Sequence, residues 1–252
     1  MTPPADDSPA ASDLVSIAAD LAPTGTLRAS INLGNPVLAQ GSPDRPSGVT
    51  VDIARAVAER LDLPLELVCF DAAKASFEAL TSGVADLAFM AIEPARAAQV
   101  AFTAPYVLIE GVYAVRADSP VGSVADVDRE AVRIGVKEGS AYDLYLTRTA
   151  QHATLVRGSE GLTVFVEQGL EVGAGIRQPV TAYVSEHPGL RVVEPAFMQI
   201  RQAVATTRDR AEATLAFLHA TVEELKSGGA VTDSLARSGQ ADTTVAPPAN
   251  PA

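Results

Sequence analysis

The sequence has little cysteine and few basic residues. One cysteine in 252 residues cannot form a disulfide within the chain. Lys and Arg number 19 against 31 Asp and Glu, which gives a formal net charge of −12. Nucleic acids and anionic membranes bind basic faces, so this charge argues against both as partners. No run of about 18 apolar residues occurs, so no segment is predicted to insert into a membrane.

The first residues lack the features of a secretory leader. They contain no basic region and no long apolar region, and Asp6, Asp7 and Asp13 carry the wrong charge. At face value this predicts a cytoplasmic protein. If a leader was removed, a periplasmic or other extracytoplasmic location is expected instead.

The common catalytic motifs are also missing. The sequence has no Walker loop, no His-Glu-x-x-His and no Gly-x-Ser-x-Gly. The three histidines are scattered without metal-ligand spacing, and Cys69 lies in a strand pattern that favours a buried, inert thiol. We therefore expect no metal site and no cofactor, and no catalytic residues are assigned.

Residues 48–106 contain the clearest pattern in the chain. Apolar residues at helical spacing begin near Val51, and a strand-like alternation follows from Leu65 to Phe70. A second helical segment ends at Ser82-Gly83, and the apolar run from Leu87 to Met90 fits a strand buried on both faces. Helices and strands alternate, which predicts an α/β fold with a mostly parallel sheet.

The rest of the chain repeats this alternation. Another α/β unit is predicted from residue 132 to residue 193, and a long amphipathic helix from Asp209 to about Ser227. Residues 1–24 are expected to be an extension with one short helix, and residues 241–252 a disordered, proline-containing tail.

The central segment also resembles a known family. Its Gly-Val-x-Val-Asp-Ile-Ala start, its Phe-Glu-Ala-Leu-x-Ser-Gly-x-x-Asp middle and its Pro-x-Arg-x-x-x-Val-x-Phe-Thr-x-Pro-Tyr end are similar to the family 3 solute-binding proteins, the polar-amino-acid receptors of ABC transporters. The resemblance covers roughly residues 25–240 and implies a two-lobed periplasmic-binding-protein-like fold of type II. Each lobe is then a mixed, mostly parallel sheet flanked by helices, with a small ligand bound in the cleft between the lobes.

The family's chain path gives the expected lobe boundaries. Lobe 1 is expected to comprise residues 25–107 and 202–240, and lobe 2 residues 111–198. The hinges then fall near 107–111 and 198–202.

The resemblance also assigns site residues. In the family, an Arg at the place of Arg96 binds the ligand carboxylate, which suits a guanidinium because its donors match two carboxylate oxygens. A Gly-Ser at the place of Ser140 supplies the contact from lobe 2, although simple helix capping explains Ser140 as well. Asn32 and Asn35 follow the first strand at its carboxyl end, where ligands bind in open sheets, although Asn is also an ordinary turn residue.

The chain departs from the family where the ligand ammonium is usually bound. Arg177 and Gln178 stand near the position of the usual acid in lobe 2, and Lys74 replaces a common Asp. Lys74, Arg96 and Arg177 would then all face the cleft, which favours an acidic ligand such as a dicarboxylate. Glu93 is the counterargument, because it could accept an ammonium and restore an amino-acid ligand.

The predicted function is therefore a solute-binding protein that closes around a small carboxylate-bearing ligand, an organic acid or an acidic amino acid. The predicted cleft walls are Asn32, Asn35, Lys74, Glu93 and Arg96 in lobe 1, and Ser140, Tyr142, Arg177 and Gln178 in lobe 2. A monomer is expected, with an ABC permease as partner if the protein is exported.

Two alternatives stay open. One is a cytoplasmic ligand sensor. The other is an enzyme on the same scaffold, because cyclohexadienyl dehydratases resemble these receptors. Such an enzyme needs a general acid, for which Glu93 or Glu110 could serve.

Overall fold

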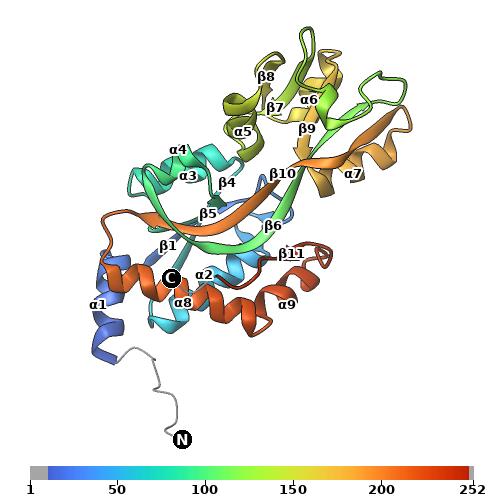
Figure 1. The fold of residues 1–252 in the computed structure, drawn as a ribbon. Coiled ribbons are helices and arrows are strands. Elements are labelled where there is room, and N and C mark those ends of the chain that lie inside the picture. Colours follow the sequence, from blue (N-terminus) through green and yellow to red (C-terminus); the bar gives the residue numbers. More distant parts are fainter. Residues whose placement is uncertain (1–10, 250–252) are drawn as a thin grey trace, which may run out of the picture.

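The computed structural model describes residues 11–249, which form two lobes on one continuous sheet (Figure 1). The helices are α1 (Ala11–Leu21), α2 (Val49–Arg60), α3 (Ala73–Thr81), α4 (Pro94–Ala97), α5 (Ala141–Thr149), α6 (Gly161–Glu167), α7 (Arg177–Glu186), α8 (Glu212–Ser227) and α9 (Ala230–Arg237). The strands are β1 (Leu27–Asn32), β2 (Gln40–Ser42), β3 (Arg45–Ser47), β4 (Leu65–Phe70), β5 (Leu87–Ala91), β6 (Val100–Arg116), β7 (Arg133–Lys137), β8 (Thr154–Gly158), β9 (Val172–Ile176), β10 (Leu190–Thr207) and β11 (Thr244–Val245).

The strand order along the sheet is β4-β1-β5-β10-β6-β9-β7-β8. At one end, β1 runs parallel to β4 and β5, and at the other end β7 runs parallel to β8 and β9. We call the part around β1, β4 and β5 lobe 1, and the part around β7, β8 and β9 lobe 2. The prediction of a two-lobed α/β fold with mixed, mostly parallel strands is confirmed.

Two long antiparallel strands, β6 and β10, run through both lobes (Figure 1). Their pairing shifts register between Val193 and Met198 and again near Ala203. The sequence predicts hinges at 107–111 and 198–202, and the structure has continuous strand at both places. The lobes are therefore joined by hydrogen-bonded strands.

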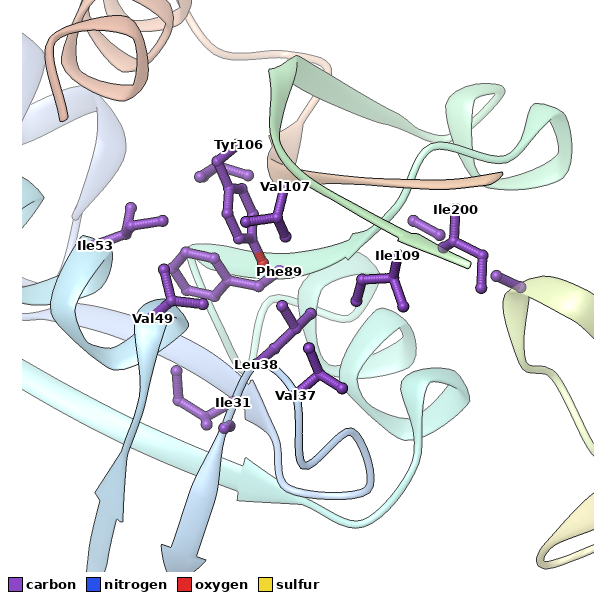
Figure 2. Packing of buried hydrophobic residues seen from close by; sticks show 14 of the residues in the cluster. Ile31, Val37, Leu38, Val49, Ile53, Phe89, Tyr106, Val107, Ile109 and Ile200 are labelled. Carbon is purple, nitrogen blue, oxygen red and sulfur yellow. The ribbon is translucent and has the colours of Figure 1, made fainter. Parts of the chain in front are cut away.

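The core of lobe 1 follows from the apolar patterns. All five residues of β5 are buried, because Leu87, Phe89 and Ala91 pack in the cluster that contains α2, and Ala88 and Met90 pack against α3 on the other face. The helix α2 presents Val49, Ile53 and Val57 to the same core. Figure 2 shows Phe89 and Tyr106 within this core. Their rings pack edge to face, with the ring centroids 6.3 Å apart.

The C-terminal segment contacts lobe 1, unlike the prediction. β11 pairs antiparallel with β6 at Leu108 and Val107, and the Lys226 Nζ donates to the Pro247 carbonyl at 2.8 Å. The prediction of a disordered tail is wrong for residues 241–249, because β6 offers a free edge whose backbone groups β11 satisfies. Residues 250–252 of that prediction, and residues 1–10 of the predicted extension, lie outside the described residues.

Candidate ligand-binding site

A cavity of about 380 Å³ lies between the two lobes. Its polar wall consists of Asn32, Asn35, Thr50, Arg96, Lys137, Glu138, Ser140, Tyr142, Glu160 and Gln202. All of these except Gln202, which lies within β10, stand at or just after the carboxyl ends of strands or at the start of helices. Parallel strands place their carboxyl ends at one edge, so the two parallel groups of strands both open onto this cavity.

Arg96 lies in the wall that lobe 1 contributes. Pro94 begins the short helix α4, where its missing N–H is not needed, and this turn directs Arg96 inward. The Arg96 side chain is only 3% exposed. Its Nη2 donates to the Gly139 carbonyl of lobe 2 at 2.9 Å, and its Nη1 to the Ala91 carbonyl at 3.4 Å.

The charge of Arg96 has no carboxylate partner. Among residues 11–249, no carboxylate oxygen lies within 4.0 Å of its guanidinium. Burial lowers the pKa of Arg96 to about 10, and the nearby negative charge of Glu93 only partly opposes this effect. The guanidinium remains charged at neutral pH, so it is a buried cation whose donors contact only neutral carbonyls.

The first turn of α5 faces Arg96 across the cleft. Ser140 caps this helix, and its Oγ accepts a hydrogen bond from the Asp143 amide at 3.0 Å. Asp143 in turn accepts from the Gly139 amide at 2.8 Å, which fixes the loop before the helix. The Ser140 hydroxyl can still donate its proton, and the first amides of a helix have no partner within the helix. Ser140 thus both caps α5 and lines the cavity.

Asn32 and Asn35 line the cavity at the end of β1, where the strand rule predicts them. Both side chains also organise their own turn, because Asn32 Oδ1 accepts from the Gly34 amide and Asn35 Oδ1 from the Val37 amide. Their amide nitrogens remain available as donors. Gly34 is required between them, since a Cβ there would lie 1.9 Å from the Asp71 carbonyl oxygen.

Lys137 and Glu160 are cavity residues that the sequence analysis missed. They end β7 and precede α6, and they form an ion pair within lobe 2. A Cβ added to Gly34 would lie 2.9 Å from the Lys137 Nζ, so Lys137 reaches across to the turn of lobe 1. The rule that led to Asn32 could have found both residues, because Lys137 ends β7 and Glu160 comes two residues after β8. Tyr142 lines the cavity as predicted, and its burial raises the pKa of its hydroxyl.

Lys74 and Arg177 do not line the cavity. Lys74 pairs with Glu138 at 2.9 Å, and both side chains are more than half exposed. Arg177 pairs with Glu110 on β6 and with Glu194 on β10, which together raise its pKa. The geometry therefore does not support the prediction of three cations facing the cleft for Lys74 and Arg177, because each pairs with a carboxylate from a distant part of the chain.

Glu93 and Gln178 are also absent from the cavity lining. The Glu93 side chain is buried and accepts a hydrogen bond from Arg148 Nη1 of lobe 2 at 2.9 Å. Gln178 Nε2 donates to the Thr243 hydroxyl of the C-terminal segment at 3.3 Å. The prediction that these two side chains bind the ligand is not supported by this geometry.

The charges that line the cavity balance. Arg96 and Lys137 face Glu138 and Glu160, so the polar wall carries two charges of each sign. The rest of the wall is largely apolar, with Leu38, Phe89, Met90, Leu162, Ile176, Val180 and Ile200 among its residues. A ligand with one carboxylate, a carbon skeleton and no large excess of negative charge suits such a wall.

The sequence profile of the bacterial extracellular solute-binding proteins, family 3, matches residues 31–238. The chain belongs to this family. The family resemblance of the central motifs in this solute-binding protein is therefore confirmed. No curated protein matches it in sequence.

Several solved structures with the same fold are described as amino-acid-binding proteins. A substrate-binding protein of an amino-acid ABC transporter from Streptococcus pneumoniae, described as bound to L-arginine, has a TM-score of 0.72 at 20% identity, over 88% of this chain and 97% of that one. A putative ABC-transporter binding component from Wolinella succinogenes, described as complexed with lysine, has a TM-score of 0.71 at 18% identity, over 84% and 95%. An ancestral amino-acid-binding protein, described as a precursor of cyclohexadienyl dehydratase, has a TM-score of 0.70 at 20% identity, over 88% and 98%. At these identities the likeness shows the fold.

Two further features concern metals and membranes. Within residues 11–249, no group of three or more His, Cys, Asp and Glu side chains is placed to hold a metal ion. Of the helices in that same range, none has both the length and the apolar character needed to cross a membrane.

Proposed function

We propose that this solute-binding protein closes its lobes around a single small amino acid, with the ligand carboxylate on Arg96. The observation that carries the proposal is the buried guanidinium of Arg96, which contacts no carboxylate of residues 11–249. A ligand carboxylate can accept two parallel charge-assisted hydrogen bonds from it. The hydroxyl of Ser140 and the first amides of α5 add donors from lobe 2, so both lobes would hold the same group.

The charge of the wall favours an amino acid over a dicarboxylate. A second ligand carboxylate would find only Lys137, which already pairs with Glu160. An ammonium would find two carboxylates in the same wall, Glu138 and Glu160, each of which is also paired with a lysine. The ligands named for the S. pneumoniae and W. succinogenes proteins, arginine and lysine, support the same choice. An ABC permease would then recognise the closed form, as the family's role implies.

The enzyme alternative gains no support from its two candidate general acids. Glu93 and Glu110, the candidates for a general acid, do not line the cavity, and each is paired with an arginine. A general acid must come within hydrogen-bonding reach of its substrate. We therefore propose binding rather than turnover.

A thermal-shift screen tests the proposal. The wild-type protein is heated with each of the twenty protein L-amino acids and with succinate, malate and citrate. An amino acid at about a hundred times its Kd should add about 2.7 kcal/mol to the free energy of unfolding. We expect at least one amino acid to raise the melting temperature, and the same amino acid to have no effect on Arg96→Gln. A screen in which only the di- or tricarboxylates act would contradict the amino-acid assignment.

A further inference from the structure

Two ion pairs join lobe 1 to lobe 2 beside the cavity. Lys74 of α3 lies 2.9 Å from Glu138, which follows β7, and Glu93 before α4 lies 2.9 Å from Arg148 of α5. Figure 1 shows α5 facing α3 and α4 at this side of the molecule. Both pairs therefore link the same two groups of elements, one from each lobe.

The two pairs flank the contact that Arg96 makes across the cleft. Glu93 stands three residues before Arg96, and Glu138 is the neighbour of Gly139, whose carbonyl accepts the Arg96 hydrogen bond. The Lys74 side chain also packs on Gly139, because a Cβ added there would lie 2.9 Å from the Lys74 Cβ. The two ion pairs therefore help to keep Arg96 opposite the first turn of α5.

An ion pair between lobes acts differently from one within a lobe. A pair within a lobe is the same whether the lobes are together or apart, so it cannot change the balance between the two forms. A pair across the cleft exists only while the lobes are together, and its free energy stabilises that form alone. Lys74, Glu93 and Arg148 do not line the cavity, so they would act without touching a ligand, whereas Glu138 belongs both to an ion pair and to the cavity wall.

We propose that Lys74–Glu138 and Glu93–Arg148 form an interlobe clasp that sets how much of the protein is closed. Lys74, Glu93 and Arg148 are then positioning residues, which hold Arg96 and α5 in the arrangement that receives a carboxylate. The apparent ligand affinity scales with the fraction of closed protein, so the clasp tunes affinity through closure. The link to affinity rests on the proposed function, but the effect on closure does not.

The two pairs should contribute unequally. Both side chains of Lys74–Glu138 are largely exposed, and such pairs change an equilibrium by about two- to fivefold. The Glu93 side chain is only 6% exposed, so losing Arg148 leaves a buried carboxylate without its partner. We expect Arg148→Gln to lower the ratio of closed to open protein by about tenfold or more.

Fluorescence energy transfer between the lobes tests the clasp without any ligand. Dyes are attached to cysteines introduced at Glu59 of α2 and Glu167 of α6, which are exposed residues of lobe 1 and lobe 2, in a Cys69→Ser background. The clasp variants are Lys74→Glu, Glu138→Lys, the double reversal of both charges, and Arg148→Gln. The control variant is Arg133→Gln, which removes an ion pair with Glu171 that lies within lobe 2.

The expected result has three parts. Lys74→Glu and Glu138→Lys each lower the closed fraction, and the double reversal restores it because the opposite charges face each other again. Arg148→Gln lowers it further, while Arg133→Gln leaves it at the wild-type value. Raising NaCl from about 0.05 M to about 0.5 M opens the wild-type protein, since salt screens the exposed pair.

Two results overturn the clasp. One is a closed fraction that Lys74→Glu and Arg148→Gln change no more than Arg133→Gln does. The other is a double reversal that stays as open as the single variants. Each can occur whether or not amino acids bind in the thermal screen, so failure of the clasp is distinguishable from failure of the proposed function.

Discussion

The Nη2 atom of Arg96 in lobe 1 lies 2.9 Å from the carbonyl oxygen of Gly139 in lobe 2. This hydrogen bond brings a buried cation to the first turn of α5 at the point where the two lobes meet. A carbonyl oxygen satisfies a donor but does not neutralise the charge. The pair Arg96–Gly139 therefore marks both where the lobes meet and where an anion would be stabilised most.

The buried charge of Arg96 should lower the stability of the protein. Its pKa is lowered to about 10, below its unfolded value, so at neutral pH folding places a charge in an environment that disfavours it. That cost is present below about pH 10 and is relieved as pH rises above it. We expect Arg96→Met to be as stable as the wild type or more stable by about 1–3 kcal/mol at pH 7, measured by urea unfolding, while losing ligand binding.

Arg28→Met is the matched control for that measurement. Arg28 Nη2 lies 2.7 Å from Asp86, whose side chain is 1% exposed. Removing this arginine leaves a buried carboxylate with a weakened partner, and a loss of about 3 kcal/mol is expected. If Arg96→Met were destabilised as strongly as Arg28→Met, Arg96 would be a structural residue rather than an unsatisfied cation.

Two substitutions at Ser140 separate helix capping from ligand binding. Asp is also a good capping residue, so Ser140→Asp should keep the melting temperature, yet its carboxylate would repel a ligand carboxylate. Ser140→Ala should lose about 1 kcal/mol of stability together with the cap. Thermal unfolding and a binding titration on both variants check this. Unchanged affinity in Ser140→Asp would show that Ser140 serves α5 alone.

Asp128 gives a pH-dependent prediction in lobe 2. The Ala153, Gln151 and His152 amides donate to its carboxylate and hold its pKa below the usual range. A carboxyl whose pKa is depressed in the folded state stabilises the fold when the pH is above its pKa in the unfolded chain, which is about 3.9. This contribution is lost as the pH falls through the folded-state pKa.

The melting temperatures of wild type and Asp128→Asn should therefore differ most at pH 6–7 and converge below about pH 4. Asp44→Asn, in the exposed turn between β2 and β3, is the control and should change little. A difference between wild type and Asp128→Asn that persists undiminished at about pH 2 would contradict the role of the Asp128 charge.

Much of the fold could be predicted from local patterns. The apolar run Leu87–Met90 indicates a strand buried on both faces, and β5 is fully buried. The long strands were harder to predict. Thr103, Ala104 and Pro105 interrupt the apolar pattern of β6, and continuity there depends on pairing with β10 about a hundred residues later, which no local pattern shows.

Some residues of the candidate site could be predicted because their position next to a strand end or a helix start is enough to place them at the cavity. Asn32, Arg96 and Ser140 follow strands or begin helices, and the cavity lies where such ends meet. Long-range pairing decides the rest. Arg177 is held by Glu110, which lies 67 residues earlier, and Lys74 by Glu138, which lies 64 residues later. A charged side chain that aligns with a family binding position therefore predicts a ligand contact only when no carboxylate or cation of the chain forms an ion pair with it.

The most direct test of the central claim is calorimetric titration of the wild-type protein with two matched ligands. One is the L-amino acid that gives the largest thermal shift, and the other is the same amino acid with its carboxylate replaced by a neutral carboxamide. If Arg96 binds the carboxylate through two charge-assisted hydrogen bonds, the amide should bind about a hundredfold more weakly or not at all. Equal affinity for the acid and the amide would contradict the account, because Arg96 would then not be the ligand's anchor.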